Sequence, residues 1–311
     1  MKFDKLAKQA IDIIGFPFTI TNTYMNKKRH VKEIGQRISI GERFIHAIVS
    51  DEKSSDYTII LDAGLSCCSI DWHYIQPQIA KFACVLSFDR AGYGWSSPAN
   101  MPYTSEDVVS DLVHILKKSQ LKPPYILVGH SFGGLNMRLF ASKYPEQVAA
   151  LILIDAVHEK RYLSSEWDAV RKNAHSKSLK LFRLGYLTSG IGLPKLLKQP
   201  VGRKHLPGPY QKYVQYLGYH PKCYEAAYNE FLYSKLSAMQ VVTAPALKAD
   251  LPIIVLSSNN TDSTWVEHQS LLSQLTAKTT QIQTSCQHSI HLENPHIVIK
   301  AIQQFIENEE S

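Results

Sequence analysis

Short apolar runs alternate along the chain with segments whose apolar positions repeat at helical spacing. The stretch 35–50 differs, because apolar and polar residues alternate about Gly41 and Glu42, which predicts a β-hairpin. Apolar runs that predict buried strands cover 57–64, 83–89, 123–129, 148–156 and 251–258, and 278–285 predicts a weaker strand. Helical patterns cover 71–82, 104–119, 132–144, 265–277 and 294–310.

Capping residues support two of these helices. Thr104 precedes one of them, with Asp107 three residues later, which is a variant of the capping box. Asn294 and Pro295 stand at the N-cap and first helical positions of the last helix. Alternating strands and helices predict an α/β fold, with a mostly parallel sheet covered by helices on both faces.

The interval between the strands at 148–156 and 251–258 is too long for a simple connection. We expect a helical lid or cap at 157–250, inserted after the sixth strand. The remaining core comprises 35–156 and 251–311, and residues 1–34 form an N-terminal helical extension.

Charge is unevenly distributed over these parts. The net charge is +7, yet the interval 157–250 holds fifteen Lys or Arg against six Asp or Glu, together with nine tyrosines. Basic residues beside aromatic ones can bind nucleic acid, but no recognition motif accompanies them here. We therefore expect no nucleic-acid partner, and interpret the segment as solvated basic helix faces over a tyrosine-rich inner surface.

The first twenty residues and the cysteines indicate the cellular compartment of the protein. The opening apolar stretch is short, is broken by Pro17 and lacks a cleavage site of the secretory type. We expect a helix packed on the domain; an amphipathic helix on a lipid surface is the alternative, so surface association stays open without stable membrane insertion. Five cysteines without paired spacing fit reduced thiols in a cytoplasmic protein.

The motif "VGHSFGG" (128–134) carries the main chemical signal. It follows a predicted strand and precedes a predicted helix, which is the context in which G-x-S-x-G forms a nucleophile elbow. Gly129 and Gly133 would let strand and helix approach closely, and Ser131 would lie at the carboxyl end of the sheet. A glycine-rich turn with no catalytic role is the alternative.

Together with "SFDRAGYGWSSP" (87–98), the run 124–159 and the final "HSIHLENP", this elbow resembles the α/β-hydrolase superfamily. The resemblance implies a triad in the chain order Ser, Asp or Glu, His, with an oxyanion hole and hydrolysis of ester- or amide-type bonds. It implies no particular substrate, and no cofactor or metal ion is expected.

Two histidines and several acids are candidates for the other triad positions. His288 fits the family's spacing better than His291 does, so we favour His288 as the base. For the acid we favour Asp155, which ends a hydrophobic strand, over Asp262 in the loop after the next strand. Glu293 is a third candidate.

The resemblance also indicates the anion site. The backbone N–H of Phe132 and that of Leu65, in "LDAGLS", would form the oxyanion hole. Asp62 beside it is expected to hydrogen-bond the loop. Asp89 and Arg90 are expected to form a structural charged pair in a tight loop.

These residues predict a serine hydrolase of carboxylic ester, thioester or amide bonds that acts on a small-molecule ester or acyl substrate, most simply a carboxylesterase or lipase. The alternative is a ligand-binding receptor on the same fold, with slow turnover or none.

Overall fold

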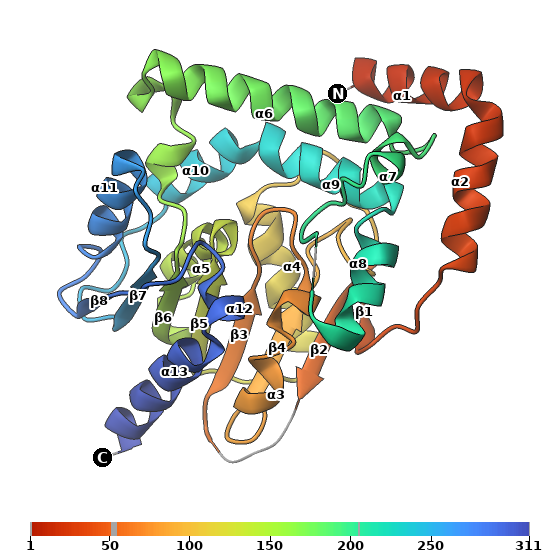
Figure 1. The fold of residues 1–311 in the computed structure, drawn as a ribbon. Coiled ribbons are helices and arrows are strands. Elements are labelled where there is room, and N and C mark those ends of the chain that lie inside the picture. The colour runs from red at the N-terminus through yellow and green to blue at the C-terminus, as the bar shows by residue number, and fades with distance from the viewer. Residues whose placement is uncertain (1, 51–54, 205, 311) are drawn as a thin grey trace.

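A computed structural model describes residues 2–50, 55–204 and 206–310 (Figure 1). Eight strands form one sheet in the spatial order β1-β2-β4-β3-β5-β6-β7-β8. The strands are β1 (Gln36–Ile40), β2 (Arg43–Ser50), β3 (Thr58–Asp62), β4 (Cys84–Phe88), β5 (Tyr125–His130), β6 (Val148–Ile154), β7 (Ile253–Ser257) and β8 (Thr279–Gln283). The pairs β1–β2 and β2–β4 are antiparallel, and all other pairs are parallel. The predicted α/β class and mostly parallel sheet are confirmed.

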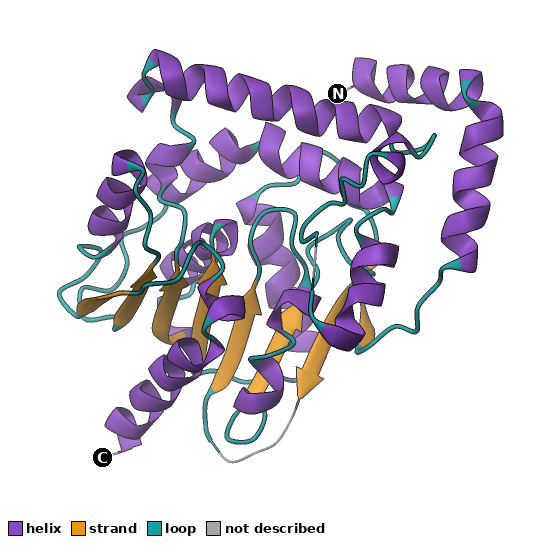
Figure 2. Ribbon diagram, in the orientation of Figure 1, coloured by secondary structure: helices purple, strands orange, loops and turns teal. Residues whose placement is uncertain are grey.

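Helices cover both faces of this sheet and its upper edge (Figures 1 and 2). They are α1 (Lys2–Ile14), α2 (Phe16–Lys28), α3 (Gln76–Ile79), α4 (Ser105–Lys118), α5 (Phe132–Lys143), α6 (Ala169–Thr188), α7 (Leu193–Leu196), α8 (Gln211–Leu217), α9 (Pro221–Leu232), α10 (Ser234–Thr243), α11 (Ser263–Leu272), α12 (Ile290–Glu293) and α13 (Pro295–Glu310).

Two hydrophobic clusters hold the layers together. Because successive side chains of a strand point to opposite faces, Leu127 of β5 packs with α4 and α5, whereas Ile126 packs with α3 and α13. Both side chains are fully buried, as are Leu112 of α4 and Ile302 of α13. Continuous apolar runs such as β5 are thus explained by a sheet that is buried on both sides.

Local signals in the sequence correspond to the observed ends of several elements. The hairpin turns at Gly41 and Glu42, with Ile40 paired to Arg43 and Gly41 at φ +77°. The backbone N–H of Thr104 donates to Asp107 at 2.7 Å, which completes the predicted capping box.

The helix predicted over 71–82 is wrong. A short 3₁₀ turn (Ser69–Trp72) and the separate α3 replace it. Pro77 lies at the start of α3, and a proline ring with no N–H cannot continue a helix that comes from before it.

Five helices, α6 to α10, lie between β6 and β7 and extend over the upper end of the sheet in Figure 1. Six of the nine tyrosines in this interval are buried, which agrees with the expected tyrosine-rich inner surface; they are Tyr162, Tyr186, Tyr213, Tyr219, Tyr224 and Tyr228. The division at 1–34, 35–156, 157–250 and 251–311, and the action of 157–250 as a lid, stay predictions.

Candidate active site

Ser131 occupies the sharp turn between β5 and α5. Its backbone angles, φ 51° and ψ −117°, are costly for a residue that has a side chain. The turn is held because the N–H of Ser131 donates to Ile154 and its carbonyl accepts from Val157 and Gly134. The strain is thus compensated by neighbouring backbone, and the Ser131 side chain lies at the carboxyl end of the sheet.

The two predicted elbow glycines lie where strand and helix approach most closely. A Cβ on Gly129 would come within 2.5 Å of the Cα of Gly134. A Cβ on Gly133 would come within 2.3 Å of the carbonyl oxygen of Asp62. Backbone atoms cannot swing aside, so only glycine fits at either position.

Asp155 follows β6 directly and is fully buried, with φ 41°. Its Oδ1 accepts hydrogen bonds from the N–H of Ser258 and the indole Nε1–H of Trp265, both at 3.0 Å. Its Oδ2 lies 2.6 Å from Nδ1 of His288. A buried carboxylate needs such partners, and here all three help to fix its orientation.

His288 links this carboxylate to the serine. Its Nε2 lies 3.1 Å from Oγ of Ser131, while Nδ1 faces Asp155. The Trp265 ring stands edge-on to the imidazole, with the two ring centres 5.4 Å apart. With Nδ1–H donating to the carboxylate, Nε2 is left to accept the hydroxyl proton of Ser131.

The other candidate base, His291, lies in a different environment. It is fully buried, and its ring packs against those of Trp72 and His130, with ring centres 4.8 and 4.3 Å away. Burial, and then the positive field of Arg203, lowers the pKa of His291 well below its usual value. The structure therefore brings His288, and not His291, to Ser131.

His130, inside the elbow, is also buried, and its Nε2 lies 3.0 Å from the carbonyl oxygen of His288. Burial is the main reason that the pKa of His130 falls well below its usual value, and His291 and His288 add to the effect. A neutral His130 can therefore support the backbone of His288 without adding a second positive charge beside it.

The alternative acids point elsewhere. Asp262 caps α11, accepting from the N–H groups of Thr264 and Trp265, and its side chain is half exposed. Glu293 is exposed and accepts from the N–H of Gln287. Neither contacts His288 in the way that Asp155 does.

The loop after β3 lies against the nucleophile turn. A Cβ on Gly64 would come within 3.1 Å of Cβ of Ser131. Phe132 is the first residue of α5, and a helix makes no internal use of its first N–H groups. The expected oxyanion donors, Leu65 and Phe132, thus lie on the two segments that flank Ser131.

Arg90 holds the peptide group that carries the Leu65 N–H. Its Nη2 donates to the carbonyl of Gly64 at 2.8 Å, and its Nη1 donates to the carbonyl of Ala63 at 2.6 Å. The Gly64 carbonyl and the Leu65 N–H belong to one peptide plane, so a bond to the oxygen fixes and polarises the N–H.

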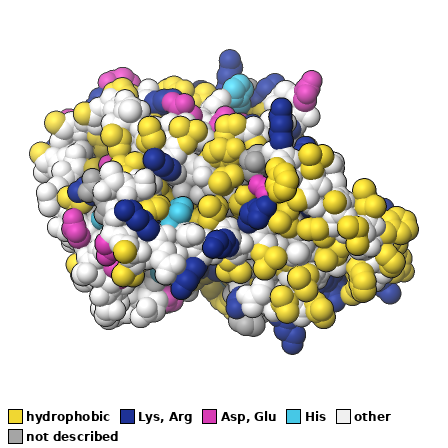
Figure 3. Space-filling model, turned by 90° about the horizontal axis from the view of Figure 1, so that it is seen from above, with side chains coloured by type: hydrophobic (Ala, Val, Ile, Leu, Met, Phe, Trp, Pro, Cys, Tyr) yellow, Lys and Arg dark blue, Asp and Glu magenta, His cyan; other side chains and the backbone are white. Residues whose placement is uncertain are grey.

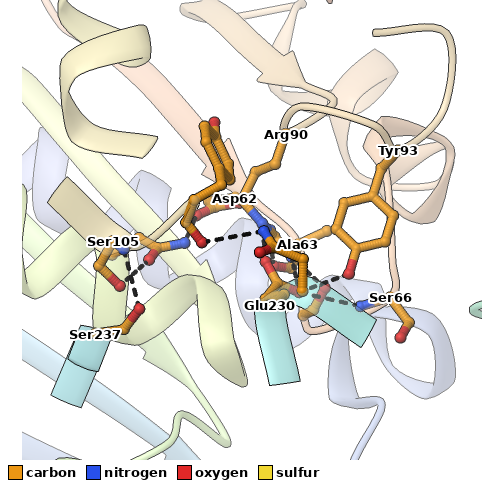
Figure 4. A network of polar contacts seen from close by, with 12 residues as sticks. Asp62, Ala63, Ser66, Arg90, Tyr93, Ser105, Glu230 and Ser237 are labelled. Atoms are coloured by element: carbon orange, nitrogen blue, oxygen red, sulfur yellow. Dashed lines mark hydrogen bonds and ion pairs between the residues drawn. The ribbon is translucent and has the colours of Figure 1, made fainter. Parts of the chain in front are cut away.

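Two carboxylates fix Arg90 in turn. Nη1 pairs with Asp62 at 2.5 Å and Nε with Glu230 at 2.7 Å, and both acids are buried (Figure 4). Burial alone would lower the pKa of Arg90, but the charges of Glu230 and Asp62 hold it well above its usual value. The hydroxyl of Tyr93 also donates to Glu230, at 2.9 Å. Glu230 belongs to α9, so a helix of the long insertion contributes to this loop.

The expected pairing of Asp89 with Arg90 is wrong. Asp89 pairs with the ring of His46 at 2.7 Å and accepts from the N–H groups of Ser69 and Trp95. Adjacent residues of an extended segment point to opposite sides, so Asp89 and Arg90 serve different loops.

A cavity of about 250 Å³ opens over the serine. Its lining residues are Ser131, Val157, Arg161, Tyr162, Asn260, Trp265 and His288. Arg161 lies over the ring of Trp265 and 3.7 Å from Asp262, and brings positive charge to an otherwise uncharged wall. The opening admits a small molecule to Ser131 and His288.

Sequence reasoning missed Glu230, Trp265 and the backbone N–H of Ser258. No motif marks them, because each reaches the site through long-range packing. One weak signal was available for Glu230, which is one of few acids in a strongly basic segment.

Comparisons with known proteins agree with this architecture. A family model described as alpha/beta hydrolase fold matches residues 53–185. The chain has the fold of the α/β hydrolases. The uncharacterized protein YqjL of Bacillus subtilis is 25% identical over 256 residues, which are 80% of this chain and 83% of that protein.

Two further proteins that are similar to this chain carry enzyme names. The 2-hydroxy-6-oxo-2,4-heptadienoate hydrolase of Pseudomonas putida is 33% identical over 101 residues, 32% of this chain and 36% of that enzyme. A solved structure named "putative epoxide hydrolase", from Pseudomonas aeruginosa, superposes with a TM-score of 0.70 at 16% identity, covering 88% of this chain and 95% of that one. Fold and relatives together support a hydrolytic enzyme.

Proposed function

We propose that this α/β hydrolase is a serine hydrolase that cleaves carboxylic ester bonds, or related thioester or amide bonds, through an acyl-enzyme. The observation that carries the proposal is the connected line of Ser131, His288 and Asp155, with contacts of 3.1 and 2.6 Å. A serine hydroxyl becomes an effective nucleophile only when a base of this kind is within reach.

In the proposed reaction, Oγ of Ser131 attacks the ester carbonyl carbon and its proton passes to Nε2 of His288. Asp155 accepts the Nδ1–H bond and stabilises the charged ring. The N–H groups of Leu65 and Phe132 stabilise the oxyanion. His288 then gives its proton to the leaving alcohol, which departs as the acyl-enzyme forms.

Deacylation reverses these roles. His288 takes a proton from water as the water oxygen attacks the acyl carbonyl, and then returns a proton to Ser131 as the carboxylic acid leaves. No group beyond these side chains and water is needed to balance either half-reaction.

The identity of the nucleophile favours acyl transfer over the reaction in the name of the epoxide hydrolase relative. Opening an epoxide or displacing a halide alkylates the nucleophile. An alkylated serine is an ether without a carbonyl for water to attack, so turnover would stop. Ser131 is therefore better suited to acyl substrates.

A fluorophosphonate probe tests the proposal, because it reacts with activated serines. Wild type is expected to be labelled, and Ser131→Ala is expected to lose the label. Ser258→Ala is the matched control, since its hydroxyl is buried close to Asp155 and makes no hydrogen bond within the described residues. A folded wild type that takes no label would favour the alternative of a ligand-binding receptor.

Among acyl substrates, a series of p-nitrophenyl esters of increasing chain length tests the class. The size of the cavity above Ser131 leads us to expect short or medium acyl chains to be turned over fastest.

A further inference from the structure

The N-terminal helix α1 packs on the protein through its charged side. Asp4 is buried, and its carboxylate accepts from Nε of Arg183 on α6 at 2.7 Å and from the hydroxyl of Tyr228 on α9 at 3.0 Å. Asp12, about two turns further along the helix, pairs with Lys8 at 2.6 Å. The predicted packing of this helix on the domain is observed, but polar contacts hold it there.

The apolar side of α1 consequently faces outward. Phe3, Leu6, Ile13 and Ile14 are 65% to 84% exposed, and their spacing puts them along one side of the helix. A helix on a globular protein ordinarily buries this side against the core. Here the arrangement is inverted, so the apolar stripe has no cover within the described chain.

Helix α2 continues the apolar surface. Phe16, Phe18, Ile20 and Tyr24 are 52% to 69% exposed. Seen from above, hydrophobic side chains gather on the right-hand part of the molecule, where α1 and α2 lie (Figure 3). An exposed apolar patch of this kind marks a surface that docks on something else.

Positive charge surrounds that patch. Lys2 and Lys5 are exposed on α1, and α2 ends in Lys27 and Lys28, followed by Arg29. The two acids of α1 are turned inward to their own partners, as described above. The outward charge of the two helices is therefore basic.

A groove of about 550 Å³ lies beside α2 and is lined by both apolar and basic side chains. Its basic lining residues are Arg29, Lys195, Lys198 and Lys204, and none of the described residues that line it is acidic. Phe18, Met25 and Leu196 supply apolar walls. Burial, and then the charge of Arg29, lowers the pKa of Lys195, as expected where cations are crowded without an anion.

We propose that α1 and α2 dock this protein on the surface of a membrane rich in anionic phospholipid, with a lipid phosphate taken into the basic groove. Apolar side chains inserted between headgroups and cations at the phosphate level are the two features of an interfacial helix. No described helix is long and apolar enough to cross a bilayer, so the protein would lie on the surface.

A second copy of the chain is a poorer occupant of the same surface. In a two-fold dimer the same patch is used on both sides, so two strongly basic surfaces would be brought together. A lipid surface of negative charge complements the patch, whereas a like-charged copy does not.

Vesicle sedimentation tests the proposal without any activity measurement, so the result is independent of the proposed hydrolysis. The protein is mixed with vesicles of phosphatidylcholine, or of phosphatidylcholine with about 30% phosphatidylglycerol. We expect binding only to the anionic vesicles, and loss of binding as salt rises from about 0.1 M to about 0.5 M.

Two triple variants separate the apolar and charged contributions. Ile13→Ser with Phe16→Ser and Phe18→Ser removes exposed apolar surface, and Lys195→Gln with Lys198→Gln and Lys204→Gln removes groove charge. The groove variant is expected to weaken binding about a hundredfold, since each of three basic residues near an anionic surface contributes about fivefold. The apolar variant is expected to weaken binding about tenfold or more, because less apolar surface is then removed from water.

Matched controls lie outside the patch. Met239→Ser with Val242→Ser and Val266→Ser removes three exposed apolar side chains of α10 and α11, and Lys117→Gln with Lys118→Gln and Lys300→Gln removes three exposed charges of α4 and α13. The controls are expected to bind as wild type does, and thermal melts by circular dichroism verify that all variants fold.

Three results would each overturn the proposal. One is equal binding to neutral and anionic vesicles, or binding to neither. Another is an equal loss of binding in the control variants. The third is a wild-type dimer, measured by analytical ultracentrifugation, that the Ile13, Phe16 and Phe18 substitutions convert to monomer, because a second copy would then cover the patch.

Discussion

Aspartate-to-asparagine substitutions distinguish Asp155 from Asp262 as the acid that contacts the catalytic histidine. In Asp155→Asn, the Oδ1 position can still accept from Ser258 and Trp265, both at 3.0 Å in wild type. Asparagine also tolerates the positive φ of 41° at this position. The fold is therefore expected to survive the substitution.

The substitution reverses the direction of the hydrogen bond to His288. The amide nitrogen that Asp155→Asn introduces, standing where Oδ2 lay 2.6 Å from Nδ1, would donate to the ring instead of accepting from it. Nδ1 must then be the acceptor, so the proton moves to Nε2, and Nε2 can no longer take the proton of Ser131. A histidine base held in the wrong tautomer lowers kcat about ten-thousandfold, which corresponds to about 5.5 kcal/mol in the activation barrier.

Asp262→Asn is the matched control. Asp262 caps α11 through its carboxylate oxygen, and asparagine is an equally good N-cap residue. We expect kcat within about twofold of wild type.

The assay is hydrolysis of a p-nitrophenyl ester followed by absorbance, with urea unfolding as a check on stability. The reasoning is refuted if Asp155→Asn keeps more than about a tenth of wild-type kcat, or if Asp262→Asn loses as much as Asp155→Asn does.

Three further predictions use other parts of the structure. Glu230→Gln leaves the buried Arg90 with one carboxylate, so the free energy of unfolding measured in urea should fall by about 3–5 kcal/mol, and kcat should fall while KM is unchanged. Glu225→Gln on the same helix is the control, and an unchanged unfolding midpoint for Glu230→Gln would contradict the argument. The pKa of His291 lies well below its ordinary value in the folded state, so acid favours the unfolded chain, in which His291 binds a proton. Between pH 7 and pH 5 the free energy of unfolding of wild type should therefore fall by about 2 kcal/mol because of this residue. His291→Leu should show a smaller dependence of unfolding free energy on pH, and equal slopes for the two proteins would contradict the argument. Arg161→Gln should raise KM about tenfold for an ester that carries a free carboxylate and leave KM for its neutral analogue unchanged, and equal shifts for both esters would exclude a role in anion binding.

The sequence predicts most of the sheet and the elbow because both depend on local patterns. Strands such as β5 and β6 are continuous apolar runs, and the backbone demands at Gly129 and Gly133 arise within seven residues of chain. The preference for His288 over His291 used a family spacing, whereas Asp155 was preferred over Asp262 because an aspartate that ends a hydrophobic strand needs a partner. Of these four residues, His288 and Asp155 are the two that the structure places in line with Ser131.

The remaining features depend on contacts that no local pattern encodes. The amphipathic pattern of α1 predicts a buried apolar side. In the structure, however, Asp4 hydrogen-bonds to Arg183 and Tyr228, which are more than 170 residues away, and the charged side of the helix faces the protein instead. Arg90 likewise meets Glu230 across 140 residues, where the sequence suggested its neighbour Asp89. Such pairings are decided by tertiary packing, and they are the parts of the site that the sequence leaves open.

The position of Glu230 has a consequence for how this protein could be re-engineered. Helical insertions between β6 and β7 look like exchangeable modules, because they connect two neighbouring strands without interrupting the sheet. In this chain the module also supplies Glu230, which together with Asp62 of the core holds the buried guanidinium of Arg90. A chimera that receives another protein's helices here would need to bring an acid to the same point in space, or to lose Arg90 as well. Replacement of the insertion and substitution of Arg90 are therefore coupled design choices, and libraries that vary only the helices should yield mostly proteins of lower stability.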